Sequence, residues 1–396
     1  MNVAIIDDPQ WRTRVDPLAD AAIVSILAEG GPPMINLSLA MLSNVPPPGA
    51  WPKALQDFVQ AVPMPANLDE QRFERAQEAF MAFGPLGVSI LACASLPETY
   101  CLPGIAKLLA MSGQLTTHVG RRLEMTGQML FDVMTPKSLL PGGVAFKAVL
   151  RTRLMHAALR YMLLNELHVA RAAGDGELRQ SVIAWTSEFG QPINQMELAY
   201  TLMTFSHVVL RSAVALGIEP RPGPFEDYIY TWNIVGRLLG IEPELLPDSW
   251  AEAEQLFERI KSAHARGSEQ SVHLMADLEG YWVTQWPTPV QSFSLPAMHA
   301  LCERLLTPDT RQMLGITVPR SLEQSEVEML MKPAAVGLRL TQRIFEALPI
   351  TSHLAAAFIQ HWATRRTAVV DGGLNDTHEH MVESWFRHDE KHGPDA

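Results

Sequence analysis

The stretch VAFKAVLRTRLMHAALRYMLLNELHVARAAG (residues 144–174) decides the fold class. It follows the turn sequence Pro141-Gly142-Gly143 and carries apolar residues every three or four positions as far as Gly174. This spacing is the period of an α-helix with an apolar face, and glycine is the usual residue just beyond a helix end. We therefore predict one long helix over residues 144–173.

A second helix is predicted at INQMELAYTLMTFSHVVLRSAVALG (193–217), which ends at Gly217. Asn194 is the expected N-cap, and Glu197 three residues later completes the signature of a capping box. Further helical periods occupy residues 66–83, 104–134, 225–240, 249–267, 294–306 and 337–348. No convincing series of alternating apolar and polar residues indicates strands, so we predict an all-α protein.

The composition is that of a globular chain with a large core. The 396 residues are 47% hydrophobic and 19% charged, and no composition change marks a domain boundary. We expect a single domain over residues 1–396. Its helical core would span 76–373, a Pro-rich N-terminal segment at 1–75 would wrap around this core or fray, and a polar tail would occupy 374–396.

Charge and cysteine usage exclude several classes of protein. Lys and Arg number 31 against 43 Asp and Glu, a net charge of -12 that would repel a phosphate backbone and argues against nucleic-acid binding. The three cysteines, Cys93, Cys101 and Cys302, are too few and too irregularly spaced for a disulfide framework or a cysteine-based zinc site. We interpret them as small buried apolar residues.

No secretory signal is visible at the N-terminus, so the expected location is cytoplasmic as the chain stands, or secreted or periplasmic if a signal peptide has been removed. The longest apolar stretch, residues 83–96, contains Gly84, Pro85 and Gly87 and is shorter than the roughly 20 residues that cross a bilayer. No transmembrane segment is expected.

Candidate chemistry lies in the middle of the long helix, at Arg153, His156 and Arg160. At 100° per residue these three side chains project from one face. A histidine among apolar residues is more often a satisfied core residue, and the arginines could form salt bridges with Glu residues of neighbouring helices. A haem would also suit this face, because it presents two propionates and an iron that needs a neutral imidazole. Spacing alone leaves both interpretations open.

A second cluster contains Arg122 and Thr126, which are four residues apart and share a helix face, whereas Arg121 points elsewhere. A cation and a hydroxyl above a haem could orient dioxygen or stabilise charge that develops on it. The simpler interpretation is a surface cation and a threonine bonded to its own backbone.

Other residues offer less. His207 fits a core residue or a pocket wall, and His378 and His380 lie in the polar tail, two residues apart and so on different helix faces. No Gly-rich phosphate loop, nucleophile elbow or His-Glu-x-x-His sequence is present, which removes support for hydrolases and nucleotide-dependent enzymes.

The signature Arg153-x2-His156-x3-Arg160 resembles the haem-binding sequence of the latex clearing proteins and their MpaB-type oxygenase relatives. GQPINQMELAYTLMTF at 190–205 is similar to the family's Gly-x-Pro-x-Asn-x-x-Glu segment, and EDYIYTWNIVGRLLGIEPELLP at 226–247 to its Trp-x-x-x-Gly-x-x-x-Gly segment. The three segments occur in the expected order, and the resemblance spans roughly residues 80–345.

The resemblance implies a globin-like helical core with additional N- and C-terminal helices that holds one b-type haem. His156 would be the proximal iron ligand, Arg153 and Arg160 would lie close to the porphyrin, and Arg122 and Thr126 would be the distal pair. Where relatives can carry a lysine able to close the sixth coordination site, this chain has Met125, so lysine ligation is not expected. Glu98 and Glu124 are candidates for the family's distal acid, although each also fits an ordinary carboxylate.

The activity implied is dioxygen-dependent cleavage of carbon–carbon double bonds in an isoprenoid, either polyisoprene or a smaller terpenoid, to aldehyde and ketone products. The expected partner is thus a hydrophobic alkene, and the chain would be a monomer or a homodimer. The rival hypotheses are a haem-based gas sensor or carrier, a haem peroxidase, and a helical binding protein without a cofactor. A sensor usually needs an output module, and no second domain is visible.

Overall fold

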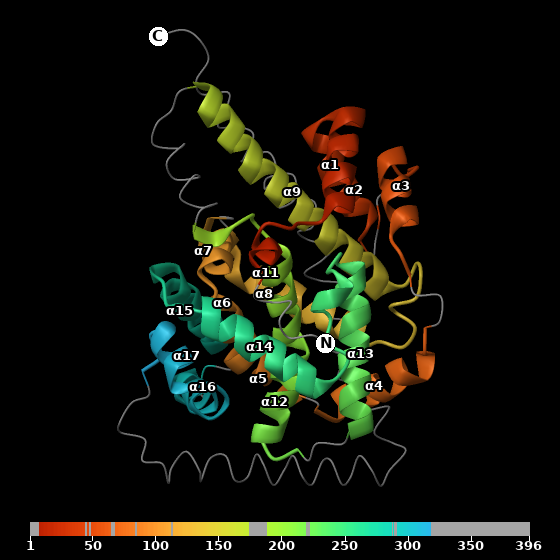
Figure 1. Cartoon of the computed structure of the whole chain (residues 1–396). Helices are drawn as coiled ribbons and strands as arrows, with labels where there is room; N and C mark the ends of the chain where they lie inside the picture. The colour runs from red at the N-terminus through yellow and green to blue at the C-terminus, as the bar shows by residue number, and fades with distance from the viewer. Residues whose placement is uncertain are drawn as a thin grey trace.

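The computed structural model describes residues 8–317, except for residues 44–45, 47–48, 65–67, 84, 112–113, 174–187, 219–221, 287 and 289–290. This part of the chain folds into helices and contains no β-strand (Figure 1). The predicted all-α class is confirmed. The predicted helix at 337–348 and the polar tail lie outside the described residues.

The N-terminal segment, predicted to wrap or fray, forms regular helices, namely η2 (Pro9–Arg12), α1 (Pro17–Gly30), α2 (Pro32–Met41) and α3 (Lys53–Ala61). The start of α1 is fixed locally, because the Asp16 side chain accepts a hydrogen bond from the Ala19 amide and Pro17 occupies the first helical position. α1 packs against α2, α3 and the long helix α9 (Val144–Ala173). This segment is therefore part of the core.

The next part of the chain contains α4 (Glu70–Phe83), α5 (Pro85–Ile90), the π-helical turn η3 (Leu91–Ser95), α6 (Leu96–Tyr100), α7 (Pro103–Met111) and α8 (Gln114–Val133). The apolar stretch at 83–96 thus becomes a series of short helical pieces, and all five residues of η3 are buried. The helical run predicted over 104–134 contains α7 and α8.

The two best-marked predictions are confirmed. α9 spans the predicted residues 144–173. The capping box at Asn194 and Glu197 opens α11 (Gln195–Phe205), and a break at Ser206 separates it from α12 (His207–Ala215). The sequence pattern showed the start of this pair but not the break.

The last described helices are α13 (Pro222–Leu238), η4 (Pro243–Leu245), α14 (Trp250–His264), α15 (Glu269–Thr284), α16 (Gln291–Leu305) and α17 (Pro308–Met313). α15 was not predicted, although Leu274, Met275, Leu278 and Trp282 give it a buried face at helical spacing. Ser268 caps its start by accepting a hydrogen bond from the Ser271 amide. Cys93, Cys101 and Cys302 are buried free thiols, as expected.

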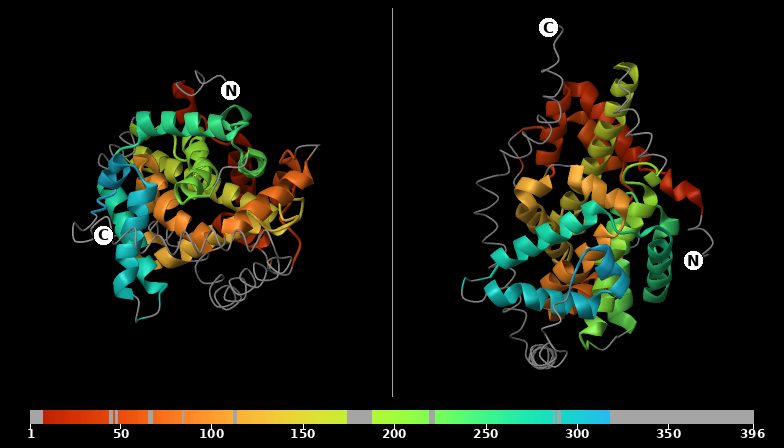
Figure 2. Two further views of the ribbon diagram at one scale, coloured as in Figure 1. Left: turned by 90° about the horizontal axis from the view of Figure 1, so that it is seen from below. Right: turned by 90° about the vertical axis from the view of Figure 1, so that its left-hand side faces the viewer.

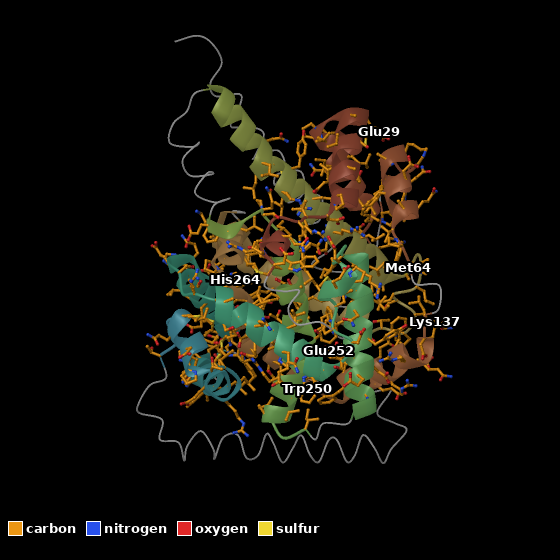
Figure 3. All side chains as sticks on the ribbon, in the orientation of Figure 1. Glu29, Met64, Lys137, Trp250, Glu252 and His264 are labelled. Atoms are coloured by element: carbon orange, nitrogen blue, oxygen red, sulfur yellow. The ribbon has the colours of Figure 1, made fainter. Side chains whose placement is uncertain are left out.

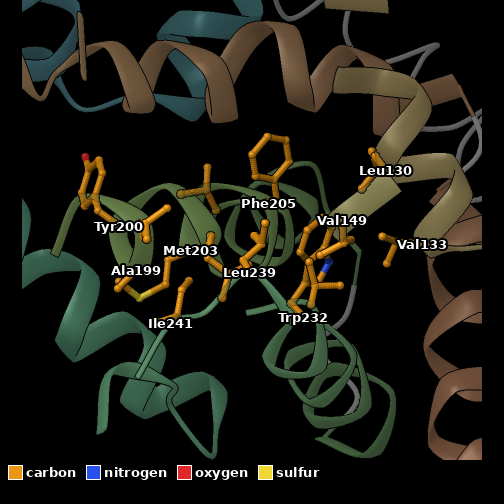
Figure 4. Packing of buried hydrophobic residues seen from close by; sticks show 14 of the residues in the cluster. Leu130, Val133, Val149, Ala199, Tyr200, Met203, Phe205, Trp232, Leu239 and Ile241 are labelled. Atoms are coloured by element: carbon orange, nitrogen blue, oxygen red, sulfur yellow. The ribbon is translucent and has the colours of Figure 1, made fainter. Parts of the chain in front are cut away.

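α11 lies in the middle of the bundle, where it packs against η2, η3, α6, α12, α13 and α14 (Figures 1 and 2). Ten of its 11 residues are buried, so the helix is buried all round rather than on one face only. Phe205 stacks on Trp232 of α13 with ring centroids 5.5 Å apart (Figure 4).

By length and composition, α11 and α12 taken together (Gln195–Ala215) could cross a membrane, and two strongly bent helix pairs in the described residues, Pro9–Gly30 with Pro32–Met41 and Gly87–Tyr100 with Pro103–Ala110, would also qualify if each were one span. In the α11–α12 stretch, 78% of the apolar window is buried inside the protein. Burial in the core accounts for its hydropathy.

Candidate functional site

His156 lies at the middle of α9 and is half-buried. Its Nδ1 atom is buried and has no hydrogen-bond partner among the described residues. Burial, with a smaller contribution from the positive charge of Arg160, lowers the His156 pKa from 6.5 to about 4. The imidazole is therefore neutral at neutral pH, which is the state that binds a metal ion.

Arg153 makes a buried ion pair with Asp16, the residue that caps α1. Its Nε and Nη2 donate to the two carboxylate oxygens at 2.6 and 2.8 Å, and both side chains are only 5% exposed. Nη1 donates to the Leu238 carbonyl at 3.2 Å. Such a bidentate arrangement neutralises the guanidinium almost without water.

Arg160, one turn beyond His156, is 2% exposed and binds Asp20 of α1. Its Nη2 donates to Asp20 at 2.7 Å, and Nη1 donates to the carbonyls of Ile193 at 3.0 Å and Pro192 at 3.4 Å. Both arginines are therefore occupied by this chain. Asp16 and Asp20 supply the negative charges, for which the sequence had left two alternatives open, glutamates of neighbouring helices or a haem. Contact between the arginines and a porphyrin stays a prediction.

The distal candidates lie on α8. Arg122 is in the helix, and its side chain is outside the described atoms; Thr126 is half-buried and Met125 is exposed. A contact between the side chains of Arg122 and Thr126 therefore stays a prediction. Their shared helix and four-residue spacing are as predicted.

α8 and α9 contact each other near both candidate clusters. The Thr152 hydroxyl on α9 donates to the Met129 sulfur on α8 at 3.9 Å, and the two helices are joined by the connection at 134–143. Thr126 is one turn before Met129 on α8, and His156 is one turn after Thr152 on α9. Each therefore lies within about one turn of this contact.

Glu98 is a structural carboxylate, as its simpler interpretation predicts. It is completely buried, and Lys261 Nζ and Arg211 Nη2 each donate to its Oε1 at 2.8 Å. Cations from α12 and α14 thus share one oxygen of this carboxylate. The Glu124 side chain lies outside the described atoms.

His207 is a core residue. It is 1% exposed, and its Nδ1 accepts a hydrogen bond from Trp250 Nε1 at 3.1 Å (Trp250 is labelled in Figure 3). Burial, and next the charges of Arg211 and Lys261, lower its pKa from 6.5 to about 3. His378 and His380 lie outside the described residues.

One glycine from each of the two other signature segments, Gly240 and Gly190, lies against the N-terminal segment. Gly240 has φ +82°, and a Cβ there would lie 2.6 Å from Asp16 Oδ2 and 2.8 Å from Arg153 Nη2. Gly190 has φ +81°, and a Cβ there would lie 2.2 Å from the Arg12 carbonyl oxygen. These positions need glycine because another segment approaches their backbone closely.

Asp16 and Asp20 are the site residues that the sequence reasoning missed. The available signals were the Asp16-Pro17 pair, a typical helix start, and the four-residue spacing that puts both carboxylates on one helix face. Neither signal indicates which part of the chain those carboxylates contact.

Comparison with known proteins places these features in context. Residues 76–336 match the family described as "ER-bound oxygenase mpaB/B'/Rubber oxygenase, catalytic domain". The rubber oxygenase of Streptomyces sp. (strain K30) is 21% identical over 319 residues, which are 78% of this chain and 72% of that protein. A solved structure of latex clearing protein in its closed state superposes with a TM-score of 0.64 at 18% identity, covering 89% of this chain and 91% of that one. At this identity the superposition shows a shared fold.

Proposed function

This chain belongs to the ER-bound oxygenase mpaB/B'/rubber oxygenase catalytic domain family, and from that premise we propose that it is a haem b-dependent dioxygenase of isoprenoid double bonds. The observation that carries the proposal is His156. It is a half-buried imidazole, held neutral, whose Nδ1 has no partner among the described residues. Its helix packs against α8, the helix proposed to carry the distal residues.

The described residues fit a haem better than a metal ion held by protein side chains alone. No group of three or more His, Cys, Asp or Glu in the described part of the chain could hold a metal ion. A haem iron needs only one protein imidazole, because the porphyrin supplies four ligands. When bound, haem would supply the redox chemistry with dioxygen.

The chain's own residues would bind and orient the reactants. His156 would ligate the iron through a neutral ring nitrogen, and Arg122 and Thr126 would donate hydrogen bonds to dioxygen. The apolar side chains of the bundle would exclude water and hold an alkene. In the overall reaction both oxygen atoms of dioxygen end in the two carbonyl groups formed where the double bond is cleaved.

The first experiment is an ultraviolet–visible spectrum of the purified protein, as isolated and after dithionite, with a pyridine haemochrome assay. We expect a Soret band and about one haem b per chain. His156→Ala should lose haem, whereas the control His207→Asn, which changes another buried neutral histidine, should retain it. Full haem occupancy in His156→Ala would disprove the ligand assignment, and a colourless wild-type protein supplied with haem would disprove the proposed function.

The substrate class is tested by supplying dioxygen with polyisoprene latex or with a prenylated small molecule and analysing the carbonyl products. Oxygen uptake coupled to alkene cleavage supports a dioxygenase. Dye oxidation by peroxide without an alkene would instead indicate a peroxidase, and reversible oxygen binding without turnover a sensor or carrier.

A further inference from the structure

We propose that Asp16 and Asp20 are positioning residues for His156, and that Arg153 and Arg160 serve to clamp α1 onto the helix that carries it. This inference rests on the proposed role of His156 as haem ligand. It assigns a task to a segment that precedes the family match, which begins at residue 76.

The two ion pairs lie on either side of His156. Arg153 is three residues before it and Arg160 four residues after it, and each guanidinium binds a carboxylate of α1. The pairs are deeply buried on the arginine side, with exposures of 5% for Arg153 and 2% for Arg160. α1 therefore contacts α9 one turn before and one turn after the imidazole, which restrains both the helix and the side chain between them.

The backbone leading into α1 is held by a second signature segment. The Gln191 amide donates to the Arg12 carbonyl at 2.8 Å, and the Gln195 amide donates to the Arg14 carbonyl at 3.0 Å. Gln195 Nε2 bridges the Val15 and Gly240 carbonyls at 3.2 and 2.9 Å. The backbone of residues 12–15 is thus held by bonds that do not depend on the ion pairs.

The third signature segment closes around the first ion pair. Arg153 Nη1 donates to the Leu238 carbonyl, and Gly240 leaves the space that the Asp16 carboxylate and the Arg153 guanidinium occupy. All three segments that carry the family resemblance therefore contact residues 12–20 or the arginines that bind them. Their shared structural role is to hold this N-terminal segment beside His156.

The two aspartates neutralise the charges of the buried arginines. Without Asp16 and Asp20, two guanidinium groups would remain buried without a counter-charge next to the imidazole. We expect them to draw water and displace α9, and residues that orient a metal ligand change metal affinity by about 10- to 100-fold when mutated.

The test uses the full-length protein loaded with haemin. Asp16→Asn removes the charge and keeps an N-cap, because Asn caps as well as Asp does. Asp20→Asn removes the second charge, and Asp20→Glu restores it at a position whose side chain is 32% exposed and has room for it. The matched control is Asp57→Asn, which breaks the exposed Lys53–Asp57 pair on α3.

The rate of haem release and the properties of the bound haem show whether the aspartates position His156 or only stabilise the fold. We expect both Asn variants to release haem to apomyoglobin about 10- to 100-fold faster, and to show an altered ferric spectrum and midpoint potential. Asp20→Glu and Asp57→Asn should match the wild type. Wild-type haem release and spectra in both Asn variants would overturn the proposal while leaving the proposed function intact.

Limited proteolysis of the haem-free protein gives an independent measure. We expect cleavage within residues 1–75 to accelerate in Asp16→Asn and Asp20→Asn, with circular dichroism confirming that each variant is folded. If the wild type takes up no haem, the proposed function fails, and unchanged protection of residues 1–75 in both variants would then overturn the clamp as well.

Discussion

The side chains beside His156 illustrate how local environment sets chemistry. The imidazole stays neutral because burial disfavours its charged form and Arg160 adds positive potential, which the carboxylate of Asp16 opposes. The environment of this position on α9 thus keeps the His156 imidazole neutral at physiological pH. The same sequence spacing without burial would give an ordinary titrating histidine.

Distal chemistry is tested at Arg122. We expect Arg122→Ala to keep its haem and to lower turnover about 100-fold, because one donor to developing charge is lost. Asp57→Asn, at the exposed Lys53–Asp57 pair on α3, is the control and should turn over normally. Unchanged turnover in Arg122→Ala would remove this residue from the mechanism.

Gly240 is expected to be intolerant of a side chain. Gly240→Ala should lower the free energy of unfolding by about 2 kcal/mol or more, because φ is +82° and the new Cβ meets Asp16 and Arg153. Gly280→Ala is the matched control. Gly280 lies in the exposed face of α15 with nothing within 4 Å, and the change should stabilise by about 0.5–1 kcal/mol. Urea unfolding of both variants measures whether the free energy of unfolding falls in Gly240→Ala and rises in Gly280→Ala.

The lowered pKa of His207 predicts that the free energy of unfolding depends on pH. Its folded pKa of about 3 lies below the unfolded value of 6.5, so the unfolded chain binds more protons between these values. The stability that it contributes is complete above pH 6.5 and is lost as the pH falls towards 3, at up to about 1.4 kcal/mol per pH unit.

His207→Asn tests this dependence, because its amide oxygen can still accept from Trp250. We expect a shallower fall in the free energy of unfolding between pH 6.5 and 4 than in the wild type. The two proteins should run parallel from pH 7 to 9, which serves as the internal control. Parallel curves across the acid range would contradict the prediction.

Among the helices, α11 depends most on its cap. Asn194 is fully buried, accepts from the Glu197 amide at 3.0 Å, and donates through Nδ2 to the Gln191 and Phe189 carbonyls. One side chain therefore ends a loop and begins the central helix. The capping-box sequence predicted this start correctly because both partners are three residues apart.

We expect Asn194→Ala to cost about 2 kcal/mol, the upper end of the range for N-caps, since it leaves buried backbone groups unpaired. Ser268→Ala, which removes the half-buried cap of the peripheral helix α15, should cost about 1 kcal/mol. Thermal unfolding of both variants gives the comparison. An equal or smaller loss for Asn194→Ala would show that its additional bonds contribute nothing.

Across the molecule, helices distant in sequence are joined by buried charges. Glu98 connects α6 to Arg211 of α12 and Lys261 of α14, and Phe257 lies beside both cations with its centroid 5.5 and 5.8 Å away. Apolar packing does not choose a unique arrangement of similar helices, whereas a buried carboxylate with two required partners does.

Glu98→Gln should therefore lower the free energy of unfolding by about 3–5 kcal/mol, because two cations lose their common partner. Asp57→Asn, at an exposed ion pair, should change it by less than about 1 kcal/mol. Chemical denaturation measures both. A small effect at Glu98 would mean that water replaces the missing charge.

Individual helices, their caps and the residues that share a helix face could be predicted from short stretches of the chain. Residues 144–173 predicted α9 to the residue, Asn194 and Glu197 predicted the start of α11, and the spacing of Arg153, His156 and Arg160 placed them on one face. These features depend on residues within about one or two turns of each other, so periodicity and capping suffice to find them.

The partners of those residues could not be predicted in this way. Asp16 is 137 positions from Arg153, and Asp20 is 140 positions from Arg160. The helix break at Ser206 and the central place of α11 likewise depend on what surrounds them. Which charges meet, and which helix faces are buried, follow from the packing of elements that are far apart in the chain, and no local pattern records that packing.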